Sequence, residues 1–73
     1  MNTAQRNEQT KKALGIVSIH FRYYRQGKAL WLVTMVNGET FNVSTAGFGT
    51  ESTVLRDMAD RLAKLGRGVV YPS

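Results

Sequence analysis

The chain has 73 residues, 42% of them hydrophobic and 21% charged, with a formal net charge of +5 at pH 7. This length fits one small domain, and this composition is too apolar for a wholly disordered chain. Cysteine is absent, which excludes disulfides, thiolate metal sites and thiol nucleophiles and mildly favours an intracellular compartment. The positive charge suggests an anionic partner such as nucleic acid.

The amino-terminal residues are polar and show no sustained apolar period. We expect residues 1–14 to form a polar, basic arm, or a short helix that forms on docking. A polar start is not a secretory signal, and the longest nearly apolar run, residues 29–36, is too short to span a bilayer. We therefore expect a cytoplasmic protein that does not bind membranes.

Three β-strands are predicted between residues 16 and 44. Residues 16–25 alternate between apolar and polar side chains, which is typical of a half-buried strand. Residues 29–36 form an apolar, β-branched and aromatic run, which predicts a central strand. Residues 40–44 then complete an antiparallel meander.

Two short turn sequences, Gln26-Gly27 and Asn37-Gly38, connect these strands. Asn-Gly is a strong hairpin signal because a type I′ turn needs positive φ at both positions. Two-residue loops at both turns fix the register, and the register decides which side chains face the core. The predicted core face of the sheet comprises Val17, Ile19, Phe21, Tyr23, Leu30, Leu32, Thr34, Val36, Phe41 and Val43.

Residues 51–65 predict one amphipathic helix that covers this face. Its apolar residues, Val54, Leu55, Met58, Leu62 and Leu65, fall within an arc of about 100°. Thr50 or Ser52 is the expected N-cap and Gly66 the expected stop, and residues 69–71 are expected to add a short edge strand. The fold class is therefore α+β, a three-stranded antiparallel β-meander with one helix packed on one face, and residues 15–73 form a single βββα domain.

The same register gives the opposite sheet face a basic, aromatic and polar composition. Large apolar side chains on a face that one helix cannot also cover indicate a binding surface or a dimer interface. Arginine can contact phosphate or guanine, asparagine can contact adenine, and aromatic rings can stack on bases. Alternatively, the amino-terminal residues or a second protomer cover Trp31. The candidate binding residues are His20, Arg22, Tyr24, Arg25, Lys28, Trp31, Val33, Met35 and Asn42.

The residue types needed for catalysis are not grouped in this sequence. His20 is the only histidine, and a general base needs an orienting partner. No spacing of His, Asp or Glu suggests a metal site. The segment Gly47-Phe48-Gly49-Thr50 lacks the P-loop lysine and the Rossmann spacing, so a strand-to-helix turn explains it. We expect no enzyme, no metal and no cofactor.

Residues 29–65 resemble the amino-terminal DNA-binding module of phage-type tyrosine integrases and the related AP2 domains. A Trp-bearing strand, a turn, a further strand and Gly47-Phe48-Gly49-Thr50 before the helix carry the resemblance, over about half the chain. In that family the exposed sheet face enters the major groove, and its Arg and Trp positions fall on Arg22 and Trp31. The chain departs from the pattern in lacking a Lys-rich helix start after Thr50 and a catalytic domain, so the resemblance implies DNA binding without recombination.

A second, weaker resemblance is to double-stranded-RNA-binding domains. Their α-β-β-β-α order fits this chain if residues 1–14 are helical. Gly47 and Gly49 stand where that family has glycines before its second helix. Glu51, however, replaces the lysine cluster with which that helix normally contacts phosphate.

These observations predict a small nucleic-acid-binding accessory or regulatory protein from a phage or mobile element, binding DNA in preference to RNA through the exposed sheet face. The alternative is a protein-interaction module, such as a small phage-type, anti-CRISPR-like inhibitor of a host defence complex, which uses the same face on a host protein. A homodimer through the Trp31 face is a third alternative.

Overall fold

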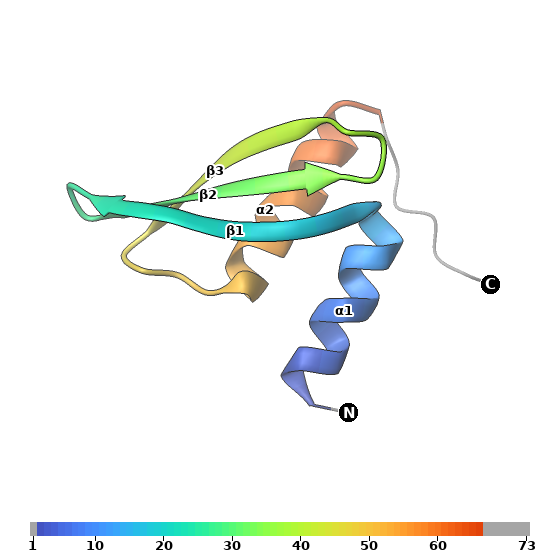
Figure 1. Cartoon of the computed structure of the whole chain (residues 1–73), viewed down its shortest axis with the longest axis horizontal. Coiled ribbons are helices and arrows are strands. Elements are labelled where there is room, and N and C mark those ends of the chain that lie inside the picture. Colours follow the sequence, from blue (N-terminus) through green and yellow to red (C-terminus); the bar gives the residue numbers. More distant parts are fainter. Residues whose placement is uncertain (1, 67–73) are drawn as a thin grey trace.

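The computed structural model describes residues 2–66, and its elements follow the order α-β-β-β-α (Figure 1). The strands form one antiparallel sheet in the order β1-β2-β3. The predicted α+β class is confirmed, and the predicted strand at residues 69–71 lies outside the described residues. The elements are α1 (Thr3–Leu14), β1 (Ile16–Arg25), β2 (Lys28–Met35), β3 (Thr40–Ala46) and α2 (Glu51–Lys64).

Residues 3–14 form helix α1, so the short helix, and not the arm, is the alternative that the structure shows for the amino-terminal segment. The Asn2 side chain accepts a hydrogen bond from the Gln5 N–H at 2.8 Å, and the Gln5 side chain accepts one from the Asn2 N–H at 3.3 Å. This reciprocal pair is a capping box. Gly15, with φ of 76°, ends the helix, and Leu14 is its only buried residue. The helix is therefore part of the domain.

Polar contacts hold α1 against α2. Ser52 Oγ donates to Asn7 Oδ1 at 3.1 Å, while Lys11 Nζ lies 2.8 Å from Glu8 and 3.0 Å from Glu51. The pKa of Lys11 is raised, mainly by its hydrogen bond to Glu8 and next by its hydrogen bond to Glu51. The same hydrogen bond from Lys11 lowers the pKa of Glu8. These contacts position a helix that has almost no apolar face of its own.

The turn between β1 and β2 has the predicted geometry. Gln26 and Gly27 have φ values of 54° and 75°, the positive pair that a type I′ turn requires. The flanking residues Arg25 and Lys28 are paired across the strands. The two-residue loop at this turn is confirmed.

Beyond this turn, β1 contains two irregularities that the sequence analysis did not include. Val17 and Arg22 each lack a partner on β2, and the pairing shifts by one residue at each of them. One extra residue exchanges the two faces for the remainder of a strand. As a result, Phe21 and Tyr24 lie on the same face although they are three positions apart, and Tyr23 lies on the other.

The turn between β2 and β3 is one residue longer than predicted. The Gly38 N–H donates to the Met35 carbonyl at 3.0 Å, and the Met35 N–H donates to the Glu39 carbonyl at 2.8 Å. Gly38 has φ of 90°, whereas Asn37 has negative φ. A three-residue loop that ends in a left-handed glycine fits these observations. The predicted type I′ turn is wrong here, and β3 moves by one residue along β2.

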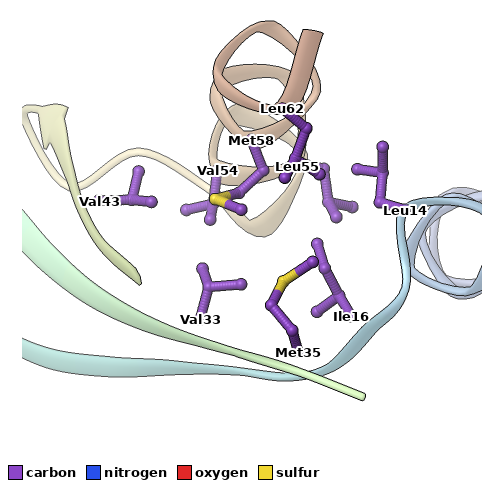
Figure 2. Packing of buried hydrophobic residues seen from close by; sticks show 9 residues of the cluster. All are labelled: Leu14, Ile16, Val33, Met35, Val43, Val54, Leu55, Met58 and Leu62. Atoms are coloured by element: carbon purple, nitrogen blue, oxygen red, sulfur yellow. The ribbon is translucent and has the colours of Figure 1, made fainter. Parts of the chain in front are cut away.

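Together these shifts invert β2 relative to the prediction. Val33 and Met35 are 0% and 3% exposed, and Figure 2 shows both side chains pointing from the sheet toward α2. The open face is the sheet face that both helices leave uncovered, and its strand residues are Ser18, His20, Tyr23, Arg25, Lys28, Leu30, Leu32, Thr34, Thr40, Asn42 and Ser44. The predicted core positions of Val17, Tyr23, Leu30, Leu32, Thr34 and Val36 are wrong, and those of Ile19, Phe41 and Val43 are confirmed. Phe21 lies on the helix side as predicted but is exposed.

Helix α2 closes the core as the sequence predicts. Thr50 is its N-cap, accepting from the Thr53 N–H at 3.4 Å, and Gly66 follows its end with φ of 75°. Leu65, predicted to face the core, is exposed. The core cluster consists of Leu14, Ile16, Val33, Met35, Val43, Val54, Leu55, Met58 and Leu62 (Figure 2).

Arg61 ties α2 to the strand at the edge of the sheet. Its Nη1 donates to the Asn42 carbonyl at 3.0 Å, and its Nη2 donates to Asp57 Oδ2 at 3.2 Å. Asp57 and Arg61 stand four positions apart, so their side chains meet on the same side of the helix. Within residues 2–66, neither helix has the length and apolar character needed to cross a bilayer.

Substitutions at Met35 and Leu32 test the observed register. Met35→Ala removes a buried side chain and should lower the free energy of unfolding by about 2–5 kcal/mol. Leu32→Ala removes a side chain of similar size from the open face and should cost clearly less, because part of that side chain is already in water. Denaturant unfolding followed by circular dichroism measures both. A larger loss for Leu32→Ala would contradict the register.

Candidate functional site

Four of the nine predicted binding residues, Tyr24, Trp31, Val33 and Met35, lie on the helix side of the sheet. Val33 and Met35 belong to the core, and Trp31 is half-buried and packs against it. These side chains are the apolar stripe that the sequence analysis placed on an exposed face, and that placement is wrong. Two changes cause this difference from the prediction. The extra residue Arg22 shifts the pairing of β1 with β2, and the longer loop after β2 shifts the pairing of β2 with β3, so the side of β2 predicted to be exposed faces the helices.

Trp31 has structural partners for both its ring and its nitrogen. Its Nε1 donates to Thr45 Oγ1 at 3.0 Å, and its ring meets Phe21 edge-to-face with centroids 5.3 Å apart. The buried Thr45 hydroxyl donates in turn to the Phe48 carbonyl at 3.4 Å. The indole N–H is therefore satisfied inside the protein, as buried polar groups require.

Four predicted binding residues lie on the open face. His20 and Asn42 are paired on either side of Leu32, while Arg25 and Lys28 face each other beside the first turn. All four are exposed. The strand residues of the open face include no acidic side chain, and Leu30 and Leu32 form its half-buried centre.

The β1–β2 hairpin ends in a basic tip, defined here as residues 22–28. It forms the end of the sheet away from α1 (Figure 1). Arg22, Arg25 and Lys28 are exposed, and none of them makes an ion pair with any residue of the range 2–66. No acidic residue occurs in the sequence between Glu8 and Glu39. Positive charge is therefore uncompensated at the tip.

Tyr24 lies on the helix side because of the extra residue in β1. Its ring stacks on that of Phe48, with centroids 4.4 Å apart and planes 15° apart. Thr45 connects this pair to Phe21 and Trp31 through its two hydrogen bonds. We call these four residues, Phe21, Tyr24, Trp31 and Phe48, the aromatic cluster.

The sequence predicts Phe48 only as part of a strand-to-helix turn. Its side chain is 66% exposed, and the flanking Gly47 and Gly49 both have φ of 62°. An aromatic residue between two glycines in a loop was the available signal, because such a loop supplies little apolar surface to bury a ring. Phe48 therefore enters the site that the structure defines.

The described residues show no grouped metal ligands and no hydrogen-bonded histidine. Residues 2–66 contain no group of three or more His, Cys, Asp or Glu side chains that could hold a metal ion. His20 is exposed and makes no side-chain hydrogen bond within that range. What the arrangement offers is cations, ring faces and hydrogen-bonding groups on two sides of one hairpin.

No family model, curated protein or solved structure matches this chain. The α-β-β-β-α order is the one that a resemblance to double-stranded-RNA-binding domains requires, and the strands followed by α2 give the order of the integrase module. Element order alone shows neither family. What the protein binds has to follow from the chemistry of its surface.

Trp31→Phe separates a structural role for Trp31 from a binding role. The smaller ring keeps the contact with Phe21 but loses the hydrogen bond to Thr45, so unfolding should become easier by about 1 kcal/mol. Thermal unfolding followed by circular dichroism measures this loss. Affinity for duplex DNA should stay unchanged, because Trp31 does not lie on the open face. A tenfold weaker duplex complex with unchanged stability would assign Trp31 to the duplex-binding surface instead.

Gly49→Ala and Gly47→Ala form a matched pair in the loop that carries Phe48. Both glycines have φ of 62°, but a Cβ at Gly49 would lie 2.5 Å from Thr45 Oγ1, whereas one at Gly47 meets nothing within 4 Å. Both changes carry the left-handed backbone cost of about 1–2 kcal/mol. Gly49→Ala should be the less stable by a further 1–3 kcal/mol or so, and equal melting temperatures would refute the close contact.

Proposed function

We propose that the protein binds nucleic acid, docking the open face and the basic tip on a duplex. One observation carries the proposal: Arg22, Arg25 and Lys28 are exposed at the end of a projecting hairpin without an acidic partner in the range 2–66. Uncompensated cations on a rigid hairpin are suited to phosphate, because each contact releases counterions from the nucleic acid.

The open face supplies groups that can contact base edges. Phosphate contacts position a protein, whereas side chains in the groove read sequence. Asn42 offers both a donor and an acceptor, the pair that adenine presents in the major groove, and His20 lies across Leu32 from it. The central leucines can contact thymine methyl groups. The open face thus combines polar and apolar readout.

DNA is the favoured nucleic acid on geometric grounds. The major groove of B-form DNA is wide enough to admit β-strands, whereas that of A-form RNA is deep and narrow. A three-stranded sheet with an uncovered face suits the wider groove. We propose the role of an accessory or regulatory protein of a phage or mobile element, acting in the cytoplasm. The resemblance to the integrase module supports this role.

The stripe of Trp31, Val33 and Met35 does not form a free surface for any partner. The predicted nucleic-acid surface, the protein-interaction alternative and the homodimer all included it, and these side chains are packed within one chain. The exposed basic tip, which has no acidic partner in the range 2–66, favours an anionic partner, and nucleic acid is the one we propose. A protein partner remains an outcome of the test below.

The double substitution Arg25→Gln/Lys28→Gln tests the phosphate contacts. Removing both cations should weaken binding to duplex DNA at low salt and reduce the slope of log affinity against log salt by about 1.8, since each phosphate contact contributes about 0.9. Fluorescence anisotropy over a salt series measures both quantities. Duplex RNA serves as the competing substrate and should bind less tightly.

The matched control is Arg56→Gln/Lys64→Gln, which removes the same charge from exposed positions on α2. Affinity and salt slope should change little in this control. If both double variants lose affinity equally, only overall charge matters and the tip is not the site. If the wild-type protein binds no duplex at low salt, the proposal fails and a protein partner becomes the better candidate.

A further inference from the structure

The aromatic cluster exposes ring surface that the fold does not need. Phe48 is 66% exposed, Tyr24 45% and Phe21 42%, and none of these three belongs to the buried core. Adjacent exposed rings are unusual on a small domain and mark a binding surface. The cluster lies on the helix side of the hairpin, and so on the opposite side of the sheet from the open face.

The backbone connects this cluster to the basic tip. Gly47 forms a bridge with Lys28, and its N–H donates to the Gly27 carbonyl at 2.8 Å, so the loop carrying Phe48 is fastened to the turn of the hairpin. Tyr24 is the immediate neighbour of Arg25 in β1. Main-chain contacts thereby hold the rings and the cations at the same end of the sheet.

The stack of Tyr24 on Phe48 is open to extension. A nearly parallel pair at 4.4 Å buries one face of each ring against the other, and the large exposure of Phe48 shows that much of its remaining surface is in water. A flat aromatic group can stack there and continue the column. Nucleic-acid bases are such groups, and every base has a ring face to offer.

We propose that the aromatic cluster is a stacking platform for unpaired bases of a nucleic-acid strand whose phosphates contact the basic tip. The proposal rests on the proposed function and adds the class of substrate. Because Arg25 and Lys28 lie on the open face at the end of the hairpin whose other side carries the cluster, a nucleic acid in which a duplex adjoins an unpaired segment can pass around the tip and occupy both surfaces at once.

Charge favours a nucleic-acid strand over a protein segment as the occupant. A protein seated on the cluster would need acidic residues to meet Arg22, Arg25 and Lys28, and apolar residues to cover the rings. A single strand brings one anionic phosphate with every aromatic base along its length. A single strand therefore supplies both the negative charge that the cations need and the flat groups that cover the rings.

Phe48→Ala is the central test, with a short fluorescein-labelled oligothymidylate as the probe. Loss of one stacked base should weaken binding about ten- to a hundredfold, while affinity for duplex DNA stays unchanged. Phe48→Trp keeps a stacking face and should bind like the wild type. Val36→Ala is the control, because Val36 is also a highly exposed apolar side chain but lies in the β2–β3 loop, away from the tip.

An abasic strand of the same length separates stacking from phosphate contact. It has phosphates but no bases, so the wild type and Phe48→Ala should bind it equally. Equal affinity of these two proteins for oligothymidylate would overturn the platform and, if duplex binding persists, leave the proposed function standing. A wild-type protein that binds neither probe overturns both, and a wild-type dimer that Phe48→Ala dissociates would assign the cluster to a second copy of the chain.

Discussion

Side chains alternate between the two faces of a β-strand, so one extra residue in a strand or turn exchanges the faces of everything beyond it. Three such residues shape this domain. Val17 and Arg22 are added to β1, and the loop after β2 has three residues in place of two. Because of them, the apolar residues of both outer strands meet the side of β2 that carries Val33 and Met35. The core under α2, the open face and the position of Tyr24 against Phe48 all follow from this pairing.

The strands could be predicted because alternation and turn glycines are local signals, and their observed bounds lie within two residues of the predicted ones. The face of the sheet on which each residue lies could not be predicted. Asn37-Gly38 suits both a type I′ turn and a longer loop ending in glycine, β2 is apolar on both faces, and an added residue such as Arg22 has no local signature. Helix α1 has one buried side chain, Leu14, and its contacts with α2 join distant parts of the sequence. At the site, the exposed polar and basic positions were predicted, whereas Phe48 was not.

Tertiary contacts also decide where the charge of the chain can act. Lys11 is held between Glu8 and Glu51, and Arg61 is paired with Asp57. These pairs neutralise much of the charge along the helices, while residues 22–28 keep theirs. Exposed cations lose little hydration before a phosphate approaches, which favours rapid and salt-sensitive association. The fold thus leaves positive charge unpaired at the exposed basic tip.

The contact between Arg61 and the Asn42 carbonyl has a further consequence. β3 is an edge strand, and its residues Thr40–Ala46 include no charge and no proline, a composition that favours recruitment of another strand and growth into fibrils. Arg61 occupies one of its backbone acceptors and places a cation beside it. The other edge strand, β1, is interrupted at Val17 and Arg22. Neither border of the sheet is a regular template, so the protein is protected from polymerising through its own strands.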